Sequence, residues 1–307
     1  MDIAVIGSNM VDLITYINDM PKEGETLEAP DFAIGCGGKG ANQAVAAAKM
    51  GSQVMMVSSV GDDMFAENTL RNFENHRIDS TFVHQIPNVS SGVAPIFVDA
   101  ESKNRILIIK GANAYVSPEM IDQAAERLKQ SSLIILQLEI PLETVYHAIA
   151  FGKKHGIPVI LNPAPASKEL DFETVCQCDF LIPNESELEL LTGLPVETDE
   201  DVESAARVLL ETGVKHVIVT LGSRGVIWMT QDEKHFIPSY KVEALDTTGA
   251  GDAFIGAFAH EFVKSGDVLN SLEVATAFAA LSVTKRGTQS SYPTAEEVLE
   301  LMASRVG

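Results

Sequence analysis

Cysteine is scarce in this chain, with three in 307 residues, and the three are poorly spaced for a metal site. Cys176 and Cys178 are separated by one residue, and Cys36 lies far from both. The sequence therefore lacks the paired cysteines that a structural zinc site requires. We expect reduced thiols and a cytoplasmic protein.

Basic residues are also few, with 22 Lys and Arg against 43 Asp and Glu, and the formal net charge is −21. Nucleic acids and anionic membrane surfaces bind basic faces, so we expect neither as a partner. Residues 1–2 lead directly into an apolar run, with no basic leader. No apolar run approaches the roughly 20 residues of a membrane-spanning helix. Any anion-binding site must be local.

Short apolar runs alternate with segments of helical periodicity over most of the chain. Strands are expected at residues 3–6, 54–61, 133–138, 158–162, 180–183 and 217–221. Helices are expected at residues 43–50, 66–75, 118–130, 142–155, 185–192, 199–212, 253–264, 270–285 and 295–304. This alternation predicts an α/β fold with a doubly wound, mainly parallel sheet covered by helices on both faces. We expect one domain over residues 1–307.

Two segments interrupt this pattern and predict a smaller sheet. Residues 13–34 show weak alternation broken by prolines and glycine, which indicates short edge strands and loops. Residues 93–99 and 105–109 flank the turn-rich segment 100–104, which predicts an antiparallel hairpin. Together, segments of about 13–34 and 90–110 are expected to form a small β-sheet lid over a ligand crevice.

A glycine-rich stretch precedes the alanine-rich helix expected at residue 43. Gly35, Gly37 and Gly40 formally match the dinucleotide fingerprint of an oxidoreductase, but the preceding run is too short and polar for the buried strand required there. It is not a Walker A motif either, because Gly40 stands where Ser or Thr must follow Lys39. We interpret it as a loop that presents backbone amides, Lys39 and Asn42 to a polyhydroxylated molecule. The alternative is a tight turn before a helix.

Residues 246–252 read Asp-Thr-Thr-Gly-Ala-Gly-Asp and lead into an apolar helix. Glycines allow a sharp turn there, so that free N–H groups at the helix N-terminus converge on one point. The positive end of the helix dipole makes such a point attractive to phosphate. Asp252 lies in the same turn, and we interpret it as a general base. The alternative is that these Asp and Thr residues cap the helix.

Polar residues follow several of the expected strands, where open α/β sheets place their binding sites. Asp12 follows the first strand, Glu139 a central one, and Asn184 and Thr220 two later ones. Asp12 is either a ligand contact or a solvated residue at a strand end. Glu187, one helical turn after Asn184, is either a site residue or one more acid on a solvated helix face.

Four motifs occur in a characteristic order across the chain: residues 7–12, residues 37–42, Asn184-x-x-Glu187 and residues 246–252. In this order they resemble the ribokinase family of carbohydrate kinases. The resemblance implies phosphorylation of a sugar by ATP, with Mg²⁺ and an activating monovalent cation such as K⁺. It also implies a small β lid that commonly mediates dimerisation, and we expect a homodimer through this lid.

The resemblance assigns roles to individual residues of the catalytic centre. Asp252 would take the proton from the attacking hydroxyl, and it would also contact the sugar. The amides of Gly249, Ala250 and Gly251 would form the anion hole. The residues that would hold the sugar are Asp12, Gly38, Lys39, Asn42 and Glu139.

The nucleotide and the cations would have their own residues. Asn184 and Glu187 would organise Mg²⁺ and the phosphates, Glu187 through water. The nucleotide would contact Asn184, Thr220, Leu221, Gly222, Ser223, Arg224, Gly225, Gly251 and Thr276. The monovalent cation would lie near Asp246, Thr248, Ser282, Lys285, Gly287 and Ser291.

One position departs from the ribose-using pattern. Ribokinases carry an asparagine two residues before the sugar-binding aspartate, and this chain has Met10 there. A thioether is a poor hydrogen-bond partner, and a buried hydroxyl left unpaired costs about 1–3 kcal/mol. We therefore expect conversion of 2-deoxyribose and ATP to 2-deoxyribose 5-phosphate and ADP. The alternative is that Met10 merely packs under the lid and that the substrate is ribose, giving ribose 5-phosphate.

Overall fold

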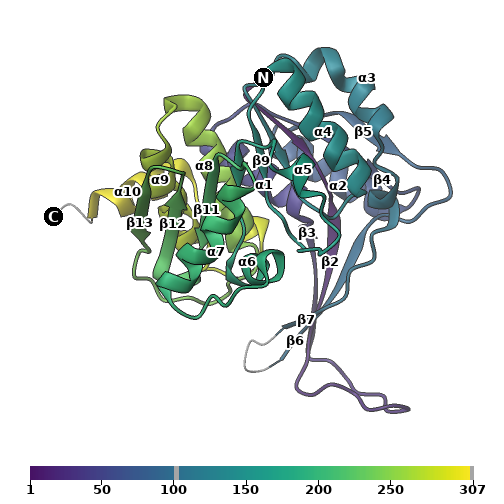
Figure 1. Ribbon diagram of the computed structural model, residues 1–307. Coiled ribbons are helices and arrows are strands. Elements are labelled where there is room, and N and C mark those ends of the chain that lie inside the picture. The colour runs from purple at the N-terminus through teal and green to yellow at the C-terminus, as the bar shows by residue number, and fades with distance from the viewer. Residues whose placement is uncertain (100–103, 305–307) are drawn as a thin grey trace.

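The computed structural model describes residues 1–99 and 104–304, which form a large and a small β-sheet with flanking helices (Figure 1). The strand order in the large sheet is β13 (Lys234–Pro238), β12 (Gly225–Met229), β11 (His216–Thr220), β10 (Phe180–Leu181), β9 (Val159–Leu161), β8 (Leu133–Leu136), β1 (Ile3–Ile6), β4 (Val54–Val60) and β5 (Asp79–Gln85). Neighbouring strands are parallel except at β12, which runs antiparallel to both of its neighbours.

Helices cover both faces of this sheet. One face packs against α3 (Pro118–Leu128), α4 (Leu142–His155), α5 (Phe172–Val175), α6 (Glu185–Thr192) and α7 (Asp199–Glu211). The other face packs against α1 (Lys39–Met50), α2 (Met64–Asn75), α8 (Ala250–Ser265), α9 (Val268–Ser282) and α10 (Ala295–Ser304). Central strands are apolar throughout because alternate side chains enter opposite cores: Ile3 and Val5 enter one, and Ala4 and Ile6 the other. The predicted doubly wound, mainly parallel fold is confirmed.

Several expected boundaries were wrong, and some elements were missed. The helix expected at residue 43 begins at Lys39, and the one expected at residue 253 begins at Ala250. Strands β5, β12 and β13 went unpredicted. Strands β5 and β13 are half-exposed edge strands that carry many polar residues. Strand β12 is buried throughout, and its short apolar run after Gly225 was not recognised. Among the described residues, no helix has the length and apolar character needed to span a membrane.

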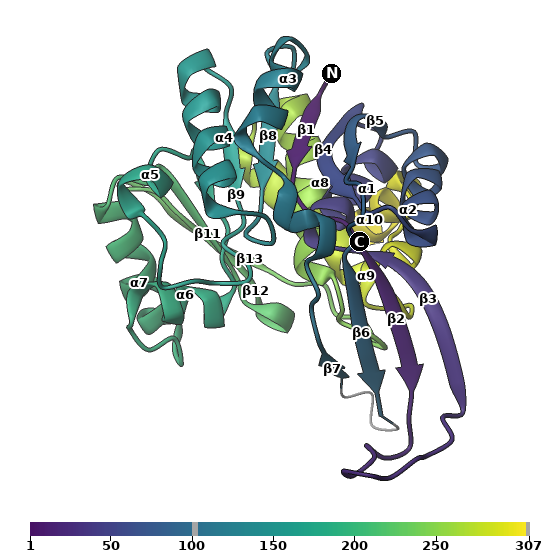
Figure 2. The same cartoon turned by 90° about the vertical axis from the view of Figure 1, so that its right-hand side faces the viewer.

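The small sheet projects away from the main body (Figure 2). Its strand order is β3 (Asp31–Gly37), β2 (Met10–Tyr16), β6 (Val93–Val98) and β7 (Asn104–Ile106). The sheet is mixed, because β2 and β6 are parallel while the outer pairs are antiparallel. The predicted hairpin between β6 and β7 is confirmed, although residues 100–103 of its turn lie outside the described residues.

The chain order places a crevice beside β1. Strand β1 pairs with β4 on one side and with β8 on the other. The chain first builds the β4 side and later returns to β8, so the sheet has a topological switch point there. Ligands of open α/β sheets bind at the carboxyl ends of the strands that flank such a point. The residues that follow β1 and β8, including Asp12 and Glu139, are therefore brought to one edge of the sheet.

Candidate active site

The carboxylate of Asp252 is held between two side chains of α1. Asn42 Nδ2 donates to Asp252 Oδ2 and Gln43 Nε2 donates to Asp252 Oδ1, each at 2.9 Å. Only 6% of Asp252 is exposed. The N-cap of α8 is Gly249, with a φ of 74° and no side-chain cap. The alternative of an Asp or Thr cap is therefore wrong, and the Asp252 carboxylate is directed at α1.

The N-terminus of α8, where we predicted an anion-binding position, has open space beside one of its glycines. N–H groups in the first turn of a helix have no acceptor inside the helix. The N–H of Ala250 is partly engaged, because it donates to Thr247 O at 3.3 Å. Beside Gly251 there is open space, since an added Cβ would meet nothing within 4 Å. Of the three predicted amides, that of Gly251 borders this open space, whereas Gly249 is packed against Thr288.

Lys39 lies among three carboxylates. Its backbone N–H donates to Glu139 Oε2 at 2.9 Å, and Ser8 Oγ donates to the same oxygen at 2.5 Å. Burial lowers the pKa of Lys39, but Asp252, Glu139 and Glu187 together outweigh burial and raise that pKa. The ammonium group is therefore stabilised in its charged form by carboxylates from three separate parts of the chain.

Asp12 lies on β2 and is buried, with 7% exposed, so the alternative of a solvated strand end is wrong. Gly37 on the paired strand makes room for it, because an added Cβ would lie 2.3 Å from Asp12 Oδ1. Burial raises the pKa of Asp12 to about 6, and the nearby carboxylates of Glu139 and Asp252 also raise it. A hydrogen bond from Thr288 Oγ1 at 3.4 Å acts in the opposite direction.

A cavity of about 230 Å³ lies beside Asp12, between the small sheet and the loops near residues 245 and 287. Residues that line it include Asp12, Ile14, Ile96, Asp246, Thr248 and Thr288. Met10, with 3% exposed, packs against Ala94 and Ile96. Met10 and Asp12 lie on the same face of β2, because alternate residues of a strand share a face. The cavity therefore combines a carboxylate with an apolar wall.

The glycine stretch is mostly not the loop that we predicted, and the alternative of a tight turn before the helix is closer to the structure. Gly35 and Gly37 belong to β3, and Lys39 already belongs to α1. The reversal takes place at Gly38, whose φ is 88°. An added Cβ at Gly38 would lie 2.7 Å from Asn9 Cα, so only glycine fits both the backbone conformation and the space. Lys39 and Asn42 consequently reach the site from a rigid helical turn.

Asn184 and Glu187 form a capping box at the start of α6. Asn184 Oδ1 accepts the N–H of Glu187, and Glu187 Oε2 accepts the N–H of Asn184, each at 2.8 Å. Burial raises the pKa of Glu187, the Asn184 N–H and Lys39 lower it, and Asp252 raises it. Glu187 is partly buried and close enough to Lys39 and Asp252 for their charges to affect its pKa, so it is not simply a solvated acid on an exposed helix face.

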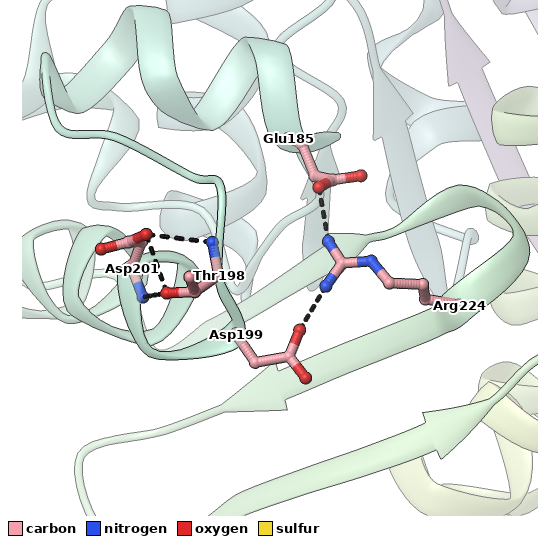
Figure 3. A network of polar contacts seen from close by, with 5 residues as sticks. All are labelled: Glu185, Thr198, Asp199, Asp201 and Arg224. Carbon is pink, nitrogen blue, oxygen red and sulfur yellow. Dashed lines mark hydrogen bonds and ion pairs between the residues drawn. The ribbon is translucent and has the colours of Figure 1, made fainter.

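The predicted nucleotide residues are only partly brought together. A bridge joins Asn184 to Thr220, and the single turn η2 (Gly222–Arg224) follows β11. The Arg224 guanidinium pairs with Glu185 and Asp199 at the starts of α6 and α7, so it is not free to face a ligand (Figure 3). Thr276 Oγ1 donates to the carbonyl of Leu272 within α9, and among the described residues no hydrogen bond joins its side chain to this loop.

Three of the predicted cation residues are joined by hydrogen bonds. Asp246 Oδ1 accepts the N–H of Thr248 at 3.0 Å, and Asp246 Oδ2 accepts the N–H of Gly287 at 2.9 Å. The side chains of the other three are bonded elsewhere: Ser282 and Ser291 to nearby carbonyls and Lys285 to Glu297. The described residues contain no group of three or more His, Cys, Asp or Glu side chains that could hold a metal.

Sequence reasoning missed two amides that support the site. Gln43 contacts Asp252, and Gln289 Nε2 donates to Asn42 Oδ1 at 2.9 Å. Neither contact is local, because Gln43 and Asp252 are 209 positions apart and Asn42 and Gln289 are 247 apart. The available signal was the polar pair Asn42 and Gln43 within an otherwise alanine-rich helix.

Curated relatives match the chain over nearly its whole length. The deoxyribokinase of Salmonella typhi is 63% identical over 303 residues, which cover 99% of each chain. The ribokinase of Haemophilus influenzae is 37% identical over 300 residues, which cover 98% of each chain.

Solved structures agree with these sequence matches. The ribokinase of Thermotoga maritima has a TM-score of 0.90 at 39% identity, covering 98% of this chain and 99% of that chain. The Arabidopsis thaliana ribokinase complexed with ribose and ATP has a TM-score of 0.91 at 33% identity, covering 98% of each chain. The profile of pfkB family carbohydrate kinases matches residues 1–295. The chain therefore belongs to the pfkB family of carbohydrate kinases.

Proposed function

We propose that the chain transfers a phosphoryl group from ATP to the 5-hydroxyl of 2-deoxy-D-ribose, giving 2-deoxy-D-ribose 5-phosphate and ADP. The observation that carries this proposal is the buried Asp252 carboxylate next to the open helix N-terminus at Gly251. The 63% identity to the Salmonella deoxyribokinase supports the choice of sugar. The second candidate is ribose, supported by the ribokinase relatives at lower identity.

The site has the parts that phosphoryl transfer requires. This reaction asks mainly for positioning and for stabilisation of charge on the moving group. Asp252 would accept the proton of the attacking hydroxyl, and the N–H groups of Gly249 and Gly251 would stabilise the phosphoryl oxygens. Sugar hydroxyls would be held by Asp12, Gly38, Lys39, Asn42 and Glu139. All five lie within or next to the group of charges around Lys39.

ATP would lie beside Asn184 and the loop of residues 220–225, which the bridge from Asn184 to Thr220 brings together. The Arabidopsis ribokinase complex with ATP supports this nucleotide as the donor. Glu187 would hold Mg²⁺ through water, and the donor set fits because Mg²⁺ prefers oxygen ligands and keeps several waters. When bound, Mg²⁺ would neutralise charge on the phosphates.

A monovalent cation, K⁺ in our proposal, would bind near Asp246. The two hydrogen bonds of Asp246 bring the loop before α8 next to the loop after α9. Main-chain and hydroxyl oxygens of these loops are the hard ligands that such a cation takes. We also propose a cytoplasmic location, which is supported by the free thiols of Cys36, Cys176 and Cys178.

Met10 supports 2-deoxyribose as the preferred sugar. Together with Ala94 and Ile96 it forms an apolar cluster on the face of the small sheet that carries Asp12. A 2-hydroxyl directed at this cluster would find no partner, whereas the hydrogen atom of 2-deoxyribose makes an apolar contact. Apolar pockets reject an added hydroxyl by only about a hundredfold at most, so ribose should remain a poor substrate.

The test compares kcat/KM for 2-deoxyribose and ribose at identical ATP, Mg²⁺ and K⁺ concentrations, in the wild type, Met10→Asn and Met10→Leu. We expect the wild type to prefer 2-deoxyribose by about tenfold to a hundredfold, and Met10→Asn to shift the ratio toward ribose by about tenfold. Met10→Leu is the control, because it keeps an apolar side chain and should keep the preference.

Two results would contradict parts of this proposal. A wild-type preference for ribose would make ribose the substrate and leave the mechanism intact. An unchanged ratio in Met10→Asn would remove Met10 as the residue that selects the sugar.

A further inference from the structure

Two adjacent residues of α1 donate hydrogen bonds to the Asp252 carboxylate. Asn42 donates to Oδ2 and Gln43 donates to Oδ1, so both oxygens are held and the plane of the carboxylate is set. Gln43 has no exposed surface, and its hydrogen bonds all go to protein groups. Asn42 belongs to the proposed sugar site. Gln43 is fully buried and therefore has no surface open to a ligand.

The orientation of the Gln43 amide is imposed by its surroundings. A carboxylate only accepts hydrogen bonds, so the NH₂ group of Gln43 must face Asp252. On the other side, Gln43 Oε1 accepts Gln137 Nε2 at 2.6 Å, and Gln43 Nε2 is also 3.3 Å from Asn162 Oδ1. Gln137 and Asn162 directly follow β8 and β9, so the support comes from rigid strand ends.

The hydrogen bond from Gln137 to Gln43 leaves another polar atom of Gln137 unpaired within the described part of the chain. Its Oε1 is buried, and it has no hydrogen-bond partner within residues 1–99 and 104–304. A buried polar atom without a partner is unfavourable and calls for a reason. When Gln137 donates to Gln43, its own oxygen is left without a partner among these residues.

The spacing between the two helices is fixed at the same point. Gly256 lies one helical turn after Asp252 on α8, and an added Cβ there would be 2.4 Å from the carbonyl oxygen of Gln43. Helix α8 therefore touches the backbone of α1 at Gln43 itself. Close packing of this kind leaves little freedom for the distance between Asp252 and Gln43.

We propose that Gln43 is a positioning residue that holds the Asp252 carboxylate in the plane needed to receive the proton of the sugar hydroxyl. The proposal rests on the function proposed above for Asp252. A general base must lie within hydrogen-bond reach of its proton in the correct orientation, and small misplacements are costly. Since Gln43 is fully buried and bonded to protein groups, we expect its contribution to belong to turnover and not to substrate binding.

The experiment measures kcat and the KM values for 2-deoxyribose and ATP in Gln43→Met, a substitution of similar size that removes the donor. We expect kcat to fall about tenfold to a hundredfold, as loss of a hydrogen bond to a charged group implies, with both KM values within about twofold of the wild type. The control is Thr144→Val, which removes the buried hydrogen bond to Val116 O on the opposite face of the sheet and should leave kcat unchanged.

Asp252→Asn separates failure of this inference from failure of the proposed function. If Asp252→Asn keeps near-normal turnover, the role of Asp252 as base is wrong, and the role of Gln43 falls with it. If Asp252→Asn loses several orders of magnitude while Gln43→Met turns over like the wild type, only the positioning role is overturned. A loss in Gln43→Met that appears mainly in KM also overturns it.

A second variant covers the case in which Gln43→Met does not fold. Gln137→Met keeps the donor to Asp252 and removes only the partner that orients the Gln43 amide. We expect a smaller loss of kcat, of severalfold, again with unchanged KM values. If Gln137→Met folds and keeps the wild-type kcat, Gln137 does not help to orient the Gln43 amide toward Asp252.

Discussion

The buried carboxylate of Asp12 titrates in the physiological range. Burial raises its pKa to about 6, mainly because the charged form loses hydration, and Glu139 and Asp252 add like charge nearby. The carboxylate form therefore predominates above pH 6 and the neutral acid below it. In the proposed site, the carboxylate would accept hydrogen bonds from sugar hydroxyls, whereas the neutral acid would present a donor in place of one acceptor.

We predict that KM for the sugar rises as the pH falls below about 6, because the form of Asp12 that binds the sugar is progressively lost. The rise should approach tenfold for each further pH unit, as for any single protonation that blocks binding. The measurement is KM for 2-deoxyribose between pH 5 and pH 8 at saturating ATP. Asp12→Asn is the control, since it should show a high KM with no inflection near pH 6. A flat wild-type profile would contradict the binding role of Asp12.

The sequence identifies a candidate site residue where its neighbours in the chain already show its position. Asp252 stands out because glycines precede it and a helix follows, and Asp12 because it follows a buried strand. The Gln43 contact to Asp252 could not be predicted, because 209 positions separate the two residues. The raised pKa of Asp12 could not be predicted either, since it requires the assembled sheet and the neighbouring carboxylates.

Arg224 connects three elements at the proposed nucleotide site. It lies in η2 and pairs with Glu185, the first residue of α6, and with Asp199, the first residue of α7 (Figure 3). The capping box of Thr198 and Asp201 fixes the start of α7 next to Asp199. Arg224 therefore ties the loop between β11 and β12 to two helix N-termini, although its side chain is partly exposed.

We predict that Arg224→Met raises KM for ATP by about threefold to tenfold. Exposed ion pairs each contribute little to stability, but Arg224 makes two, and both hold the loop between β11 and β12 in place. KM for 2-deoxyribose should stay unchanged, since Arg224 is remote from Asp12. Arg207→Met is a matched control, because Arg207 is an exposed arginine of α7. An unchanged KM for ATP would show that the loop keeps its shape without the two ion pairs, and a change in both KM values would indicate a general loss of structure.

Most elements with an apolar face in the core were predictable, and the buried strand β12 is an exception. Helix α4 and helix α6 have the predicted boundaries, because helical periodicity and a terminal glycine mark both. Strands β5 and β13 carry too many polar residues to be recognised as strands. Helix α1 begins at Lys39, and its start was missed because glycine and lysine next to a turn signal read as loop.

At the scale of the whole molecule, the small sheet has two faces of different character. Its inner face carries Asp12 and Ile14, which line the cavity. Phe32 and Ile34 occupy the opposite face of β3, and their exposed fractions are 54% and 55%. Leu107, immediately after β7, is 62% exposed. Exposed apolar residues gathered on one sheet mark an interaction surface, and we propose that two copies of the chain pair through it as a homodimer.

We predict that the wild type has twice the chain mass of 33.0 kDa in sedimentation and light-scattering measurements, and that Ile34→Asp is a monomer because a carboxylate cannot be buried unpaired in an apolar interface. Leu299→Asp is the control, since Leu299 is also exposed, at 65%, but lies on α10, and it should remain a dimer. A monomeric wild type would contradict the proposed assembly.

Ile34 adjoins Gly35, which pairs with Asp12 in the sheet, so loss of the dimer should also loosen the small sheet beside the cavity. KM for 2-deoxyribose should therefore rise in Ile34→Asp and stay at the wild-type value in Leu299→Asp.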